Sequence, residues 1–213
     1  MENFDRKEHW ENIYKSKESK ELSWFQPSPA TSLNFPEQFN VPLTAKIIDV
    51  GGGDSLLVDH LPDLHYKDIT VLDISEVALD RAKQRPGDRS SQVKWIVADA
   101  SNFKPIAKYD FWHDRAAFHF LTQEPEIENY LETVQQSINP KGILVIGTFS
   151  EYGPKKCSGI EIRQYSENSM AERLNKFFVK IKCISVDHPT PFGTIQKFVF
   201  LQFQKITGSL MLN

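Results

Sequence analysis

The glycine-rich sequence DVGGGDS occupies residues 49–55 and is the strongest indication of the fold. It follows the short apolar run KIIDV at 46–50, which is typical of a buried strand, and it precedes a helix expected over 55–65. Three glycines between a strand and a helix let the backbone turn tightly and approach a ligand closely. Their N–H groups and the start of the helix favour an anionic group. A tight turn alone needs about one glycine, so the stretch predicts a ligand-binding loop.

Outward from this loop, strands alternate with helices. Strand-like runs are expected at 46–50, 69–73, 92–98, 109–113 and 142–149. Helices are expected after Ser75, a plausible N-cap, and over the apolar spacing of 127–138. This alternation implies a parallel sheet with right-handed crossovers.

The last third of the chain breaks the alternation. A helix candidate at 166–176 is followed by two long strand-like runs, 177–186 and 195–205, without a helix between them. Strands joined in this way should pair antiparallel. The predicted fold class is therefore α/β, a Rossmann-like doubly wound sheet of seven strands, with five parallel strands and a C-terminal antiparallel hairpin.

Composition limits the classes of partner. The 213 residues favour one domain, and 40% hydrophobic residues support a core. The net charge of −3 argues against nucleic acid as the main partner. There is no apolar run long enough for a membrane span, and the charged N-terminus does not resemble a signal peptide. The two cysteines, Cys157 and Cys183, lack metal-site spacing, so we expect no metal and a cytoplasmic protein. The oligomeric state stays open.

The first 44 residues differ from the rest. They are polar at first, then rich in proline and aromatic residues, with an amphipathic helix expected over about 5–16. We interpret 1–44 as a lid segment, 45–205 as the ligand-binding domain and 206–213 as a C-terminal tail.

Carboxylates recur at the ends of the first three strands. Asp49 lies within the first, Asp73 ends the second and Asp99 follows the third. In open α/β sheets this carboxyl edge is where ligands bind. A carboxylate at Asp73 can accept both hydroxyls of a ribose, and one at Asp99 could accept an adenine amine. Asp73 also has a structural alternative as a turn or N-cap residue. The loop departs from the dinucleotide pattern because Leu56 replaces the third glycine.

Four motifs in order, DVGGGDS, VLDIS, VADA and YDFWHDRAAFHFL, resemble motifs I to IV of the class I (seven-stranded) S-adenosylmethionine-dependent methyltransferases. The resemblance covers about residues 45–205. It implies S-adenosylmethionine as the methyl donor and S-adenosylhomocysteine as the product. It also implies that the glycines line the methionine end, that Asp73 binds the ribose and that Asp99 binds the adenine. The full set of expected cofactor contacts is Asp49, Gly51, Gly52, Gly53, Asp73, Ile74, Asp99, Ala100 and His113.

The fourth motif bears on the acceptor. It lacks the paired prolines typical of enzymes that methylate base amines or glutamine amides, so those acceptors are disfavoured. Its Trp-x-Asp-Arg-like pattern is similar to thiopurine methyltransferase-like and lysine methyltransferase-like enzymes. The aromatic pair Trp24 and Phe25 resembles the segment that covers the cofactor in such enzymes.

Candidate catalytic residues follow the fourth strand. Asp114 and His113 could accept the proton that a thiol, hydroxyl or ammonium loses. Asp114 and Arg115 have a structural alternative as a salt bridge closing the turn. The long loop 151–165 exceeds the usual length of such connections and suggests acceptor recognition. The predicted substrate residues are Trp24, Phe25, Arg115, Tyr152 and Arg163.

The predicted function is methyl transfer from S-adenosylmethionine to a small-molecule thiol or amine, or to a protein lysine. Two alternatives stay open at this point, a nucleotide-dependent oxidoreductase on a Rossmann sheet and a non-catalytic S-adenosylmethionine-binding protein. The sequence does not identify the acceptor.

Overall fold

The computed structural model describes residues 4–207, and its centre is a seven-stranded sheet in the order β3-β2-β1-β4-β5-β9-β8. Neighbouring strands pair in parallel from β3 to β5, whereas β9 is antiparallel to both β5 and β8. The predicted fold class is therefore confirmed, and the hairpin joins the sheet at the β5 edge. The strands are β1 Lys46–Val50, β2 Asp68–Asp73, β3 Val93–Val97, β4 Tyr109–Arg115, β5 Ile138–Phe149, β8 Phe178–Pro189 and β9 Ile195–Lys205.

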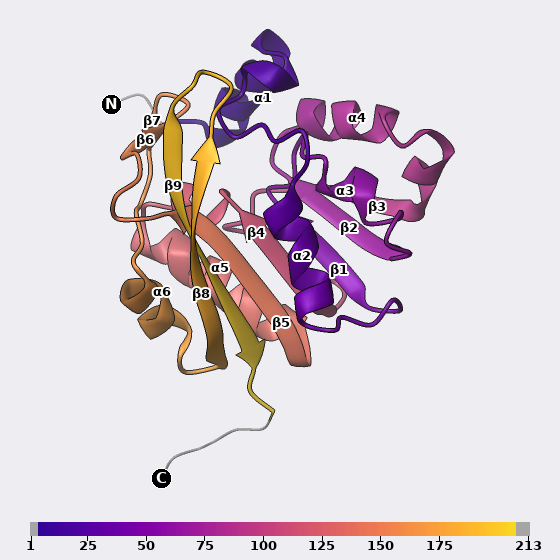
Figure 1. Cartoon of the computed structure of the whole chain (residues 1–213), viewed down its shortest axis with the longest axis vertical. Helices are drawn as coiled ribbons and strands as arrows, with labels where there is room; N and C mark the ends of the chain where they lie inside the picture. Colours follow the sequence, from indigo (N-terminus) through magenta and orange to yellow (C-terminus); the bar gives the residue numbers. More distant parts are fainter. Residues whose placement is uncertain (1–3, 208–213) are drawn as a thin grey trace.

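Helices cover both faces of the sheet, with α2 in front and α5 behind in Figure 1. One hydrophobic cluster joins the sheet to α5 and α6, through side chains such as Tyr130 and Met170. The other joins the opposite face to α2, α3 and α4, through side chains such as Phe35 and Leu79. The helices are α1 Arg6–Ser16, α2 Ala30–Gln38, α3 Leu57–His60, α4 Glu76–Gln84, α5 Glu124–Ser137 and α6 Glu167–Leu174, with 3₁₀ turns η1 Ser19–Glu21, η2 Gly87–Gln92 and η3 Phe118–Phe120.

The N-terminal segment packs over the carboxyl edge of the sheet, where α1 lies near α4 at the top of Figure 1. Trp10, Tyr14 and Leu22 are buried and form a third cluster with Ala78 of α4. Glu11 adds polar contacts, because its carboxylate accepts hydrogen bonds from the first backbone N–H groups of α4. The expected lid therefore has a small core of its own.

Several element boundaries differ from the prediction. The expected helix at 55–65 is reduced to α3, because Pro62 follows it and restricts the residue before it. Helix α2 is not among the helices that the sequence predicts. Strand β4 continues to Arg115, so Asp114 and Arg115 lie within the strand and not after it. The N-caps at Ser75 and Ser166 place α4 and α6 where the sequence predicts them.

A small hairpin, β6 Lys156–Cys157 and β7 Ile160–Glu161, organises the predicted loop at 151–165. Its turn contains Ser158 and Gly159, both with positive φ. Among residues 4–207, no helix has the length and apolar character needed to cross a membrane.

Candidate active site

A pocket opens at the carboxyl edge of the sheet, beside the glycine loop. It encloses about 750 Å³ of empty space, solvent at its mouth included. Gly51 lines it with φ +66°, a conformation that favours glycine. A Cβ on Gly51 would lie 2.3 Å from the Cβ of Ala117, so the loop and the turn after β4 fit only without a side chain. Gly52 and Gly53 lie behind, against Asp49 and Asp73.

Asp73 lies where the ribose-binding carboxylate is predicted. Its side chain lines the pocket at the end of β2 and accepts a hydrogen bond of 2.8 Å from the N–H of Ser75. Burial, and then the nearby charge of Asp49, raises its pKa to about 7. Ile74 lines the same wall. The pocket therefore contains a buried carboxylate whose ionised form would be stabilised by hydrogen bonds from the hydroxyls of a ligand.

Asp99 and Ala100 line the far end of the pocket. One oxygen of Asp99 accepts hydrogen bonds from the N–H and the hydroxyl of Ser101. The other oxygen pairs with Arg6 of α1 at 2.9 Å, and Arg6 also binds Glu126 at 2.7 Å. In this structure the carboxylate oxygen predicted to bind adenine is paired with an arginine of the same chain.

His113 and Asp49 do not line the pocket, contrary to their predicted contacts with the cofactor. They are paired on adjacent strands, with Nδ1 of His113 2.7 Å from an oxygen of Asp49. The other ring nitrogen lies 2.9 Å from the hydroxyl of Ser32 on α2. His113 is only 2% exposed, so its ring is a buried link between sheet and helix and not an acceptor-site base.

Asp114 also lies outside the pocket lining and is fully buried. One oxygen accepts the N–H groups of Ala117 and Phe118, and the other accepts the hydroxyl of Tyr130 at 2.7 Å. Burial raises its pKa to about 6. The geometry is that of a carboxylate that closes a turn, although not through the predicted salt bridge with Arg115. The proton-acceptor role predicted for Asp114 is therefore not supported.

Arg115 does reach the pocket, as predicted. Its guanidinium donates to the carbonyl of Trp24 at 3.2 Å and lies 4.9 Å from the ring centre of Phe198. Trp24 and Arg115 also line a smaller neighbouring pocket, together with Phe25. Three of the predicted substrate residues are thus brought together on one side of the glycine loop.

Tyr152 and Arg163 are not brought to the pocket. The side chain of Tyr152 is 84% exposed. Arg163 instead pairs with Glu124 at the start of α5 and lies over the ring of Tyr165. The loop contributes Cys157 instead, whose thiol lies in the pocket wall.

Several lining residues were not predicted. Trp10 and Tyr14 lie on the amphipathic helix expected over about 5–16, and Cys157 lies in the loop 151–165. The signal for Trp10 and Tyr14 is that two aromatic residues spaced four apart share one helix face. The sequence offers no comparable signal for the others, which are Arg6, Phe120, Leu121, Phe149 and Phe198.

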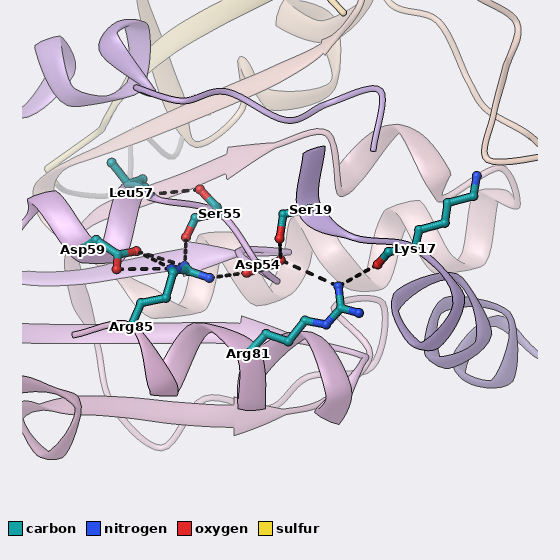
Figure 2. Close-up of polar contacts among 8 residues, drawn as sticks. All are labelled: Lys17, Ser19, Asp54, Ser55, Leu57, Asp59, Arg81 and Arg85. Atoms are coloured by element: carbon teal, nitrogen blue, oxygen red, sulfur yellow. Dashed lines mark hydrogen bonds and ion pairs between the residues drawn. The ribbon is translucent and has the colours of Figure 1, made fainter. Parts of the chain in front are cut away.

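An ion-pair cluster ties the N-terminal segment to the glycine loop (Figure 2). Asp54, 8% exposed, pairs with Arg85 and accepts the hydroxyl of Ser19. Arg81 lies 3.9 Å from the same carboxylate and donates to the carbonyl of Lys17 at 2.7 Å. Buried and half-buried charges therefore hold the N-terminal segment to α4. We call this segment, from Lys17 to Trp24, the roof of the pocket.

Comparison with known proteins is consistent with this site. A family model described as a methyltransferase domain matches residues 48–144, from β1 into β5. This part of the chain is therefore similar to a methyltransferase domain. This match spans the glycine loop, Asp73, Asp99 and the end of β4, and it confirms the resemblance to class I S-adenosylmethionine-dependent methyltransferases.

Individual relatives are distant. The chain is 26% identical to an eEF1A lysine and N-terminal methyltransferase of Mus musculus, over 98% of this chain but 30% of that protein. It is 28% identical to a malonyl-[acyl-carrier protein] O-methyltransferase of Anoxybacillus flavithermus, over 49% of this chain and 39% of that protein. The chain thus spans well under half the length of these curated relatives.

Among solved structures, the N-methyltransferase NodS from Bradyrhizobium japonicum, in complex with S-adenosylhomocysteine, superposes with a TM-score of 0.70 at 15% identity. The superposition covers 94% of this chain and 99% of that one. At this identity the likeness shows the fold. Together the matches support the predicted enzyme class, S-adenosylmethionine-dependent methyltransferase, and the predicted cofactor.

Proposed function

We propose that this chain transfers a methyl group from S-adenosylmethionine to an acceptor bound beneath Trp24. The methionine end of the cofactor would lie at Gly51, the ribose at Asp73 and the adenine between Ile74 and Ala100 near Asp99. The observation that carries the proposal is a single pocket lined by Gly51, Asp73 and Asp99, which come from separate motifs of the sequence. When bound, the cofactor supplies an activated methyl group.

The protein's own contribution to this reaction is alignment. The sulfonium already activates the methyl group, because its sulfur leaves readily. Holding the nucleophile in line with the methyl–sulfur bond is therefore the main catalytic effect, and it can lower the activation barrier by up to about 7–11 kcal/mol. The aromatic walls at Trp10, Trp24 and Phe120 would exclude water and restrict the acceptor's approach. These rings meet edge to face, with centroids of Trp10 and Phe120 4.8 Å apart.

The side chains predicted as proton acceptors are already occupied. His113 is held between Asp49 and Ser32, and Asp114 accepts three hydrogen bonds. Within the described chain, the carboxylates that line the pocket are Asp73 and Asp99, both assigned to the cofactor. We therefore favour a nucleophile that needs no enzyme base, or one that loses its proton to water.

Two classes of acceptor have support. A protein lysine or N-terminus is favoured by the eEF1A methyltransferase relative, whose similarity extends over 98% of this chain. A small acceptor group is favoured by the position of the acceptor side under a packed N-terminal segment, and the malonyl-[acyl-carrier protein] O-methyltransferase relative is consistent with a small group held on a carrier protein. The pocket wall contains a cationic side chain, Arg115, which an incoming ammonium would have to approach.

Two measurements test the proposal. Calorimetry should give micromolar binding of S-adenosylmethionine and S-adenosylhomocysteine, and much weaker binding of NADH. Tighter binding of NADH would instead favour the oxidoreductase. A screen of thiols, amines, carboxylates and protein extract with methyl-labelled cofactor should then show label in either small products or protein bands. No transfer to any acceptor would favour a binding protein without catalysis.

A further inference from the structure

Arg115 carries a positive charge that the protein leaves largely unmatched. Its Nη2 atom is buried and has no hydrogen-bond partner, while one hydrogen bond, from Nη1, goes to the carbonyl of Trp24. Within residues 4–207, no ion pair involves this guanidinium. Buried charges in proteins are normally paired, because removing an ion from water is costly. An arginine kept in this state lacks an anionic partner.

The groups around Arg115 do not supply that partner. The charge of the Asp49 carboxylate acts on Arg115 and raises its pKa, but this carboxylate is bound to His113. Burial raises the pKa of the Cys157 thiol, so the thiol stays neutral. His188 is also kept neutral, because burial and then Arg115 lower its pKa, and it donates to the carbonyl of Ser23 at 2.8 Å.

His119 adds a second unpartnered donor beside the same aromatic walls. Its Nδ1 accepts the N–H of Phe149 at 3.2 Å, so the neutral ring carries its proton on Nε2. That Nε2 is buried without a partner, and burial, then the charge of Arg115, lowers the pKa of the ring to about 3. The rings of His119 and Phe198 have centroids 6.5 Å apart. Two buried donor atoms without a partner, on Arg115 and His119, thus lie in this part of the site.

The position of Arg115 gives it access to a ligand. It lines the main pocket with Phe149 and Phe198 and the smaller pocket with Trp24 and Phe25. An apolar body could contact these rings while an anionic end meets the guanidinium. The planar fork of arginine suits a carboxylate, which can accept two parallel N–H bonds.

We propose that Arg115 binds a carboxylate group of the ligand that completes this site. The inference rests on the proposed function and deepens it, because it names a chemical feature of the bound ligand. The carboxylate has two possible sources, the methyl acceptor or the methionine end of the cofactor. Both use the same chemistry at Arg115, and the experiment separates them.

The test compares Arg115→Gln and Arg115→Lys with the wild-type protein. Gln retains a donor for the carbonyl of Trp24 without the charge, and Lys retains the charge without the fork. Arg163→Gln is the matched control, since Arg163 lies outside the pocket. Thermal unfolding of each variant identifies any that fail to fold.

The acceptor arm uses phenylacetate, benzoate and hexanoate, each against its neutral amide, by calorimetry with and without S-adenosylhomocysteine. We expect wild-type protein and Arg163→Gln to prefer carboxylates about tenfold or more, Arg115→Gln to lose this preference and Arg115→Lys to recover part of it. This result assigns the carboxylate to the acceptor.

The cofactor arm compares S-adenosylhomocysteine with 5′-methylthioadenosine, which lacks the amino-acid end. If Arg115→Gln lowers the affinity for S-adenosylhomocysteine tenfold and leaves the affinity for 5′-methylthioadenosine unchanged, the carboxylate is assigned to the cofactor. If Arg115→Gln changes neither the carboxylate preference nor the difference between the two nucleosides, the proposal is overturned. Failure of the wild-type protein to bind S-adenosylhomocysteine would instead overturn the proposed function, while the acceptor arm without cofactor still tests Arg115.

Discussion

Asp73 is a buried carboxylate whose ionisation its surroundings oppose. Burial comes first among the causes and the charge of Asp49 adds to it, which together raise the pKa of Asp73 to about 7. A ribose needs the ionised form, since only that form accepts hydrogen bonds at both oxygens. Under the proposed ribose contact, cofactor binding and ionisation of this side chain are coupled.

We expect the affinity for S-adenosylhomocysteine to rise by roughly tenfold or more between pH 5.5 and pH 8. The sign follows because the ligand favours the ionised carboxylate, which predominates only above the raised pKa. Calorimetry across this range measures the effect. At pH 8, Asp73→Ala should lose about 1.5–3 kcal/mol of binding free energy. Asp114→Asn is the control and should keep the wild-type slope. A flat profile would contradict the ribose assignment.

Asp114 differs from Asp73 because its hydrogen-bond capacity is used within the protein. Asp114→Asn keeps an oxygen for the N–H groups of Ala117 and Phe118 but loses the acceptor for Tyr130. We expect a loss of about 1 kcal/mol in unfolding free energy and unchanged turnover per folded molecule. Asp114→Ala leaves three donors without a partner and should cost more. A large fall in turnover in a stable Asn variant would restore the proton-acceptor hypothesis.

At the scale of elements, helix α1 covers the pocket and also competes for it. Arg6 pairs with the oxygen of Asp99 that Ser101 does not bind. The two side chains are partly exposed, Arg6 at 18% and Asp99 at 33%. An ion pair of this kind contributes about 1 kcal/mol or less. Any ligand amine that binds Asp99 must displace it.

We expect Arg6→Gln to raise the affinity for S-adenosylhomocysteine by up to about fivefold, because the competing ion pair is absent. Lys15→Gln, an exposed position on the same helix, is the control and should change nothing. Calorimetry at low ionic strength is the measurement. Weaker binding by Arg6→Gln would mean that Arg6 contacts the cofactor and does not compete with it.

The connection between the N-terminal segment and the domain is also testable. Asp54→Asn should weaken the cluster with Arg85, Arg81 and Ser19, so trypsin should cut faster near residues 15–20. Saturating S-adenosylhomocysteine should slow this cleavage, because it binds the closed form. Asp63→Asn, which breaks the exposed pair with Arg89, serves as control. Equal cleavage rates for both variants would mean that the ion-pair cluster of Asp54 does not hold the N-terminal segment in place.

At the scale of the whole molecule, the fold could be predicted because its signals are local. Alternating apolar runs, glycine loops and N-caps such as Ser75 are set by neighbouring residues, and the strands they define pair as expected. Helix α2 was missed because its sequence contains Pro36 and little polar periodicity. Its stability comes from packing Phe35 on the sheet, which no local pattern shows.

The site could be predicted only in part. Asp73 ends β2, Gly51 directly follows β1 and Asp99 comes just after β3, so topology alone brings them together. The roles of His113 and Asp114 depend on which way each side chain leaves β4 and on what it meets. Ser32 and Tyr130, the residues they meet, come from helices far away in the sequence. The ion pair of Arg6 with Asp99 has no sequence signal for the same reason.

The contacts of Ser23 have a consequence for the order of folding. Its carbonyl accepts a hydrogen bond from His188, and its hydroxyl accepts one from Gln196, so the roof near Trp24 is anchored by the last two strands. These contacts close loops of more than 160 residues, among the slowest to form in a chain. On the ribosome, the parallel strands can assemble while the C-terminal hairpin is still being synthesised. The side of the pocket near Trp24 is therefore completed only after both β8 and β9 have been synthesised.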